Sequence, residues 1–155
     1  YEGLRNIPMA GCIWMVKRSV FDKIGTYDND YLIPYEDSDF SASARKAGYE
    51  IYCDSGALSL HEAKKRTYVS PLVDFIGITS PERAYRTARN KLIFMRKHAG
   101  LKFIPFFFIL LPIYVILHSI FIVASKRFDI LLLYWKGLLS GIIYSIVYVF
   151  KKHVA

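Results

Sequence analysis

The sequence is poor in the residues that build disulfide frameworks, zinc sites and phosphate loops. Its two cysteines, Cys12 and Cys53, stand alone, without the CxxC spacing that indicates a zinc site or a redox motif. We expect them to be free thiols in a reducing compartment rather than a disulfide. No glycine-rich phosphate loop is present. The composition therefore argues against a disulfide-rich secreted domain and against a P-loop nucleotide site.

Acidic residues are almost missing from the C-terminal third. Asp129 is the only acid after residue 102, and residues 103–155 are almost wholly apolar and aromatic. The start of the chain lacks the pattern of a cleaved signal peptide, and its first residue is Tyr1, which predicts a fragment or a processed product. The change in composition predicts two parts: residues 1–102, ending in a basic juxtamembrane helix, and residues 103–155, a membrane-associated region.

Two long apolar runs fill the membrane-associated region. Residues 103–124 carry no formal charge, and because about 20 apolar residues cross a bilayer core, we expect a transmembrane helix there. Residues 130–150 contain one charge, Lys136. They predict either a second span or a helix in the interface with Lys136 extended toward water. Gly137 and Gly141 have the GxxxG spacing that allows close helix contact.

A basic helix precedes these runs. Ser80 as N-cap and Pro81 at the first helical position predict a helix to about residue 98. Residues 83–102 contain seven cations and no acid: Arg83, Arg86, Arg89, Lys91, Arg96, Lys97 and Lys102. The positive-inside bias then places residues 1–102 in the cytoplasm. Most of these cations are expected to contact anionic lipid rather than nucleic acid, because a membrane segment follows.

Three members of this helix are candidate binding residues. Arg86, Arg89 and Asn90 follow one another at helical spacing, and arginine suits bidentate contacts with phosphate. They are therefore held as candidate acceptor- or donor-binding residues.

The most informative segment places three carboxylates within four residues. Glu36, Asp37 and Asp39 follow an aromatic stretch and open a short helix that is expected to end at Gly48. The structural alternative is that one carboxylate merely caps the helix, where the macrodipole favours negative charge. Three together predict a site for general-base chemistry or metal binding.

His61 is a candidate metal ligand at the end of a predicted strand over residues 57–60. Glu62 follows it, but the HExxH zinc motif needs a second histidine at position 65, where Lys65 stands. The sequence therefore excludes this metallopeptidase motif.

The order of these segments resembles the C-terminal half of a family 2 glycosyltransferase of the GT-A fold, and within it the rhamnosyltransferase-like branch that builds bacterial cell-surface polysaccharides. The resemblance covers residues 9 to about 98. The matching segments are Gly11-Cys12, Val16-Lys17-Arg18, Val20-Phe21-Asp22-Lys23-Ile24-Gly25, Tyr27-Asp28, Tyr35-Glu36-Asp37-Ser38-Asp39-Phe40, Ala44-Arg45-Lys46-Ala47-Gly48-Tyr49, Leu60-His61 and Tyr85-Arg86-x-x-Arg89-Asn90. It implies an α/β fold, the C-terminal part of a Rossmann-like GT-A domain, followed by hydrophobic membrane helices.

The resemblance also implies roles for single residues. Asp37 would be the catalytic base and Glu36 would position acceptor or donor. Asp39 would support the helix start, and it joins Arg86, Arg89 and Asn90 as a candidate acceptor- or donor-binding residue. His61 would ligate a divalent metal, Mn²⁺ or Mg²⁺, and Arg89 would face the diphosphate of the donor. The nucleotide-binding half, with its Asp-x-Asp motif and the remaining metal ligands, would lie outside this chain.

We therefore expect an inverting glycosyltransferase, or the acceptor-side part of one, at the cytoplasmic face of the inner (plasma) membrane. Its partners would be a nucleotide sugar, a glycan or lipid-linked acceptor and membrane lipid, but no nucleic acid. The alternative is a non-catalytic, membrane-anchored binding module in a polysaccharide-assembly complex.

Overall fold

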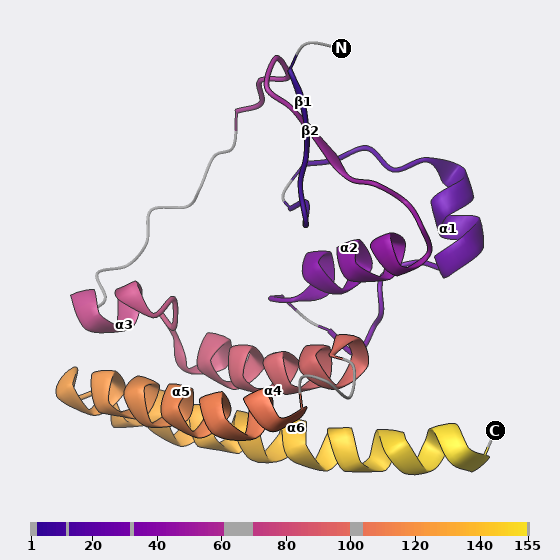
Figure 1. The fold of residues 1–155 in the computed structure, drawn as a ribbon. Helices are drawn as coiled ribbons and strands as arrows, with labels where there is room; N and C mark the ends of the chain where they lie inside the picture. The colour runs from indigo at the N-terminus through magenta and orange to yellow at the C-terminus, as the bar shows by residue number, and fades with distance from the viewer. Residues whose placement is uncertain (1–2, 12, 32, 61–69, 100–103, 155) are drawn as a thin grey trace. The chain divides into compact units, whose positions relative to one another are not determined.

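A computed structural model describes residues 3–11, 13–31, 33–60, 70–99 and 104–154 (Figure 1). By their internal contacts the residues form two compact units, Tyr1–Lys65 and Arg66–Ala155, called here the N-terminal and C-terminal units. The N-terminal unit contains β1 (Leu4–Asn6), α1 (Arg18–Ile24), α2 (Glu36–Lys46) and β2 (Tyr52–Asp54), and the C-terminal unit contains α3 (Pro71–Phe75), α4 (Pro81–His98), α5 (Ile104–Ala124) and α6 (Phe128–Val154). The basic helix α4 thus groups with the apolar helices, whereas the functional division expected at residue 102 stays a prediction.

The expected α/β, Rossmann-like fold is wrong. Strands β1 and β2 are three residues each and pair antiparallel, and the described residues contain no other strand. The run predicted as a strand at residues 57–60 is irregular, and so is the apolar run of residues 10–16 where it is described. An apolar run becomes a strand only where neighbouring strands pair its backbone and cover its face. Without such neighbours, Met15 and Leu58 remain almost fully exposed.

Helices α1 and α2 enclose the core of the N-terminal unit. Phe40 and Val20 are buried there, and the ring centroid of Trp14 lies 5.2 Å from that of Phe40. Both helices end where the sequence predicts, because Gly25 (φ 81°) and Gly48 (φ 92°) adopt a positive φ that other residues rarely accept.

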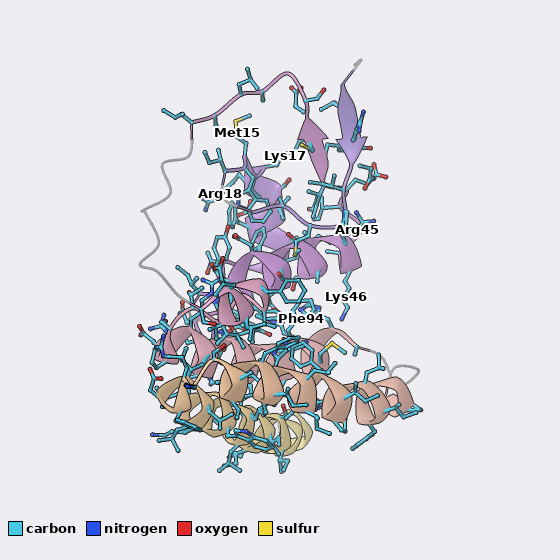
Figure 2. The ribbon with its side chains drawn as sticks, turned by 90° about the vertical axis from the view of Figure 1, so that its left-hand side faces the viewer. Met15, Lys17, Arg18, Arg45, Lys46 and Phe94 are labelled. Carbon is cyan, nitrogen blue, oxygen red and sulfur yellow. The ribbon has the colours of Figure 1, made fainter. Side chains whose placement is uncertain are left out.

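Arg45, in the last turn of α2, connects this helix to the residues of β1. Its Nη1 donates to Asn6 Oδ1 (3.1 Å) and to the carbonyl oxygen of Ile7 (3.0 Å), and Figure 2 shows its side chain beside the end of the strand. The Ile7 amide in turn donates to the carbonyl oxygen of Ile51 (2.8 Å). These bonds fix α2, and with it the carboxylate segment, against the short sheet.

In the C-terminal unit, α4 starts as the sequence predicts. Ser80 Oγ accepts a hydrogen bond from the Arg83 amide at 3.2 Å, and Pro81 occupies the first turn, where its missing N–H costs no helical bond. The apolar stripe of α4, which includes Ala84, Ala88 and Leu92, is buried against α5 and α6. The core that they share also contains Val73, Ile78, Val115, Ile122, Ile130, Tyr134 and Leu138.

The two glycines of α6 bring this helix against α4. A Cβ at Gly141 would lie 2.9 Å from the carbonyl oxygen of Arg89, and a Cβ at Gly137 would overlap the carbonyl of Tyr85. The Tyr85 hydroxyl donates to Ser140 Oγ at 3.0 Å beside this contact. The close helix contact expected from the GxxxG spacing is present, and its partner is the basic helix α4.

One helix of the described residues is long and apolar enough to cross a membrane, and it is Phe128–Val147 within α6. The described apolar part of α5, Phe108–Ala124, is shorter. The sequence singled out residues 103–124 as the span, and residues 100–103 lie outside the described part of the chain.

Candidate functional site

The three carboxylates fall in the first turn of α2, which begins at Glu36. The preceding residue, Tyr35, adopts a left-handed conformation with φ 93° and ψ −10°. A non-glycine residue there costs on the order of 1–3 kcal/mol, and such outliers cluster at active sites and ligand clamps. The positive end of the helix dipole favours the negative charges of Glu36 and Asp37.

Glu36 and Asp37 line an open cleft of about 290 Å³ in the N-terminal unit. Residues 33–38 form one wall, and Met9, Ala10 and Gly11 form the other. Gly11 lies beside the carboxylate, since a Cβ there would be in van der Waals contact with Asp37 Oδ2 at 3.6 Å. The Ala10 amide donates to Ser41 Oγ at 3.3 Å and so fixes this wall to α2.

Tyr27 lies next to the carboxylate pair. Burial raises the pKa of Tyr27 above its usual value, and the negative charge of Asp37 raises it further. A hydrogen bond to Asp37 and the charge of Glu36 act in the same direction, against the effect of a hydrogen bond with Trp14. Tyr27 therefore lies beside the site without lining the cleft. In the sequence it appears only in the matching segment Tyr27-Asp28, and nothing in its spacing from Asp37 signals contact.

Glu36 and Asp39 have different surroundings. The Glu36 Oε2 atom is buried and has no hydrogen-bond partner among the described residues. Buried polar atoms are nearly always paired, so this oxygen is an exception, and because it is buried it is not itself open to a ligand in the cleft. Asp39 is buried and does not line the cleft, and its amide donates to the carbonyl oxygen of Tyr35 at 2.8 Å. This bond is an ordinary helical one that does not involve the side chain, so the predicted roles of Asp39 stay predictions.

The candidate residues Arg86, Arg89 and Asn90 lie on α4 in the other unit. Arg86 pairs with Glu82 one turn away. Arg89 Nη1 donates to Asn90 Oδ1 at 2.8 Å, and its guanidinium lies 5.4 Å from the ring centroid of Tyr144. Their convergence with Asp37 on one substrate stays a prediction.

The metal prediction depends on His61, which lies outside the described residues. Elsewhere in the described ranges, no group of three or more His, Cys, Asp or Glu side chains is arranged to hold a metal ion. Glu36 and Asp37 offer oxygen ligands of the type that Mg²⁺ and Mn²⁺ accept, but two carboxylates do not complete a protein site. The described residues alone therefore do not fit a divalent ion, and no step below depends on one.

No protein-family model, curated protein or solved structure matches this chain. The chemistry of the site is therefore inferred from its residues, its geometry and the order of the motifs.

Proposed function

We propose that this chain provides the acceptor side of an inverting glycosyltransferase, with Asp37 as the general base. The observation that carries the proposal is the pair of neighbouring carboxylates, Glu36 and Asp37, that line an open cleft. The ordered motif set of residues 9–98 supports the same function. The proposal does not depend on an α/β fold.

The main requirement on the base is its position next to the acceptor hydroxyl. The acceptor hydroxyl gives its proton to Asp37 as its oxygen forms a bond to the anomeric carbon of the sugar. The bond from that carbon to the diphosphate oxygen breaks, and the nucleoside diphosphate leaves with the electron pair. Attack from the opposite face inverts the configuration. The Glu36 carboxylate, which lines the cleft, would hold a second hydroxyl of the acceptor or donor in place.

The apolar C-terminal unit and the net charge of +8 support action at a membrane. The excess of arginine and lysine next to the apolar helices favours a membrane face with anionic headgroups, such as the cytoplasmic face of a plasma membrane. A glycan or lipid-linked acceptor for cell-surface polysaccharide fits this location, with a nucleotide sugar as donor.

The test is a transfer assay on membranes from cells that express the native gene product. A panel of radiolabelled nucleotide sugars is offered together with a lipid extract from the same cells, and NMR determines the anomeric configuration of the product. We expect donor-dependent labelling of the lipid fraction with inverted configuration. Product with retained configuration would contradict the role of Asp37 as a base.

The alternative, a non-catalytic binding module, gives a different result in the same experiment. Such a protein would retain labelled acceptor in a pull-down with the detergent-solubilised chain, yet no donor of the panel would be consumed. Binding without transfer would therefore replace the enzymatic proposal by the module.

A further inference from the structure

The outward faces of α5 and α6 form a continuous apolar surface. Large side chains on α6 recur there at helical spacing, and Trp135 is half exposed between Leu132 and Leu139. Further exposed apolar side chains are Ile109, Ile113, Ile116, Leu117, Ile120 and Val123 on α5, and Phe128, Ile142, Ile143, Ile146 and Val147 on α6. A surface of this kind marks an interaction with a membrane or a partner.

The opposite side of the same helix layer is charged, because α4 lies along α6 there. The backbone of Tyr85 lies against Gly137, and the carbonyl oxygen of Arg89 lies against Gly141. Each contact is four residues further along both helices, so the two helices run parallel. In Figure 1, α4 lies on one side of α5 and α6. The cations of α4 thus lie beside the middle part of α6.

The start of the C-terminal unit lies at the turn between α5 and α6. Ser70 Oγ donates to Ser125 Oγ at 3.1 Å, and the ring centroids of Phe75 and Phe121 are 6.1 Å apart. The chain therefore enters the unit beside this turn, and α4 then runs away from it together with α6.

A membrane-crossing α6 conflicts with these contacts. The middle of the apolar stretch Phe128–Val147 lies near Gly137, at the level of Tyr85. Arg86 and Arg89 would then lie near the centre of the bilayer, where charged side chains are the most costly to place. The layer is instead amphipathic as a whole, with α4 as its polar side and the outer faces of α5 and α6 as its apolar side.

We propose that α4, α5 and α6 lie flat in one leaflet of a bilayer with anionic headgroups, and that no helix crosses it. The outer faces of α5 and α6 contact the acyl chains, and α4 lies at the level of the headgroups. The exposed cations Arg83 and Arg96 on α4, with Lys126 in the turn, meet the anionic phosphates. The exposed Lys136 extends along α6 toward the same headgroups. This mode of attachment is independent of the proposed glycosyl transfer.

Three positions on α6 can report how deep this helix lies in the bilayer. Phe128, Trp135 and Ile142 are all exposed and seven residues apart, so they share one face. The first and last are about 21 Å apart along the axis, at 1.5 Å per residue. Because the chain has two tryptophans, Trp14→Phe leaves Trp135 as the only reporter. Adding Trp135→Phe with either Phe128→Trp or Ile142→Trp moves the reporter along the face.

The full chain is reconstituted in vesicles of phosphatidylethanolamine and phosphatidylglycerol that contain phosphatidylcholine brominated at different acyl positions. We expect all three tryptophans to be quenched most by the same brominated position, since the helix lies parallel to the membrane. Circular dichroism checks that each variant keeps the helix content of the parent.

Two results would overturn the proposal. In a crossing helix, the tryptophan at position 128 would report the headgroup region while Trp135 reports the bilayer centre. Alternatively, a partner protein or a second copy on this face would shield all three tryptophans, and no brominated lipid would quench them.

Discussion

The hydroxyl of Tyr27 lies beside the carboxylate of Asp37, and that carboxylate helps to raise the pKa of the phenol above its usual value. The two residues belong to different segments, a turn after α1 and the first turn of α2. Their contact joins the aromatic core around Phe40 to the cleft, because Tyr27 also stacks on Phe40 with ring centroids 5.0 Å apart. The candidate base is therefore held from one side by a packed aromatic cluster.

This contact predicts a change in the titration of Tyr27. Asp37→Asn removes the negative charge and leaves an amide, so the pKa of Tyr27 should fall, while burial still keeps it above its usual value. The measurement is ¹³C NMR of ring-labelled tyrosine, with Tyr27→Phe to assign the resonance. Asp22→Asn is the matched control, because Asp22 is an exposed residue paired with Arg18. An unchanged titration of Tyr27 in Asp37→Asn would show that the two groups do not interact.

Gly137→Ala tests the contact between α4 and α6. By helix propensity alone, alanine should stabilise the helix by about 1 kcal/mol. The new Cβ would overlap the Tyr85 carbonyl, which belongs to a helix backbone and has little freedom to move. Overpacking of this kind costs about 1–3 kcal/mol. We therefore expect net destabilisation in chemical unfolding in detergent. Leu139→Ala, on the exposed face of α6, should change stability far less, and a stabilised Gly137→Ala would refute the contact.

The lowered pKa of Lys91 predicts that the free energy of unfolding rises with pH. Burial lowers the pKa of Lys91 to about 8, and its ammonium lies 3.0 Å from the ring centroid of Tyr114. Between about pH 8 and the unfolded pKa of about 10.4, the unfolded chain binds more protons than the folded chain, so stability increases with pH in that window. Below about pH 8, the folded state contains the charged form of Lys91, and the partial burial of this charge lowers the free energy of unfolding.

Lys91→Met should remove this cost. We expect the variant to be more stable near pH 7 by about 1 kcal/mol, less than the full shift would give, because the side chain is partly exposed. Its stability should no longer rise between pH 8 and 10. Unfolding midpoints at both pH values measure the difference, and a parallel rise in both proteins would assign the effect to another group.

The helices could be predicted from the sequence because their signals are local. Ser80 and Pro81 start α4, and Gly48 ends α2, each through the backbone of its own turn. The short sheet could not be predicted in this way. Leu4 pairs with Asp54, 50 positions further along the chain, and no local pattern encodes such a partner. The run predicted as a strand at residues 57–60 lacks strand neighbours and is irregular.

The candidate site was predictable in part for the same reason. Glu36, Asp37 and Asp39 are neighbours in sequence, so their position at the start of α2 follows from the helix signal. The contact of Tyr27 with Asp37 is tertiary, and the matching segment Tyr27-Asp28 did not indicate it. The GxxxG pair indicated a close helix contact but could not name its partner, because spacing describes one helix only.

The most direct test of the proposed function introduces Asp37→Asn or Asp22→Asn into the native gene product and compares the rates of sugar transfer of the two variants in membranes. The two variants lose the same charge by the same substitution, one in the cleft and one on the exposed surface of α1. If Asp37 is the general base, its variant should lose ~10²-fold or more in turnover, while the Asp22 variant keeps that of the parent. Near-normal transfer by Asp37→Asn would contradict the account.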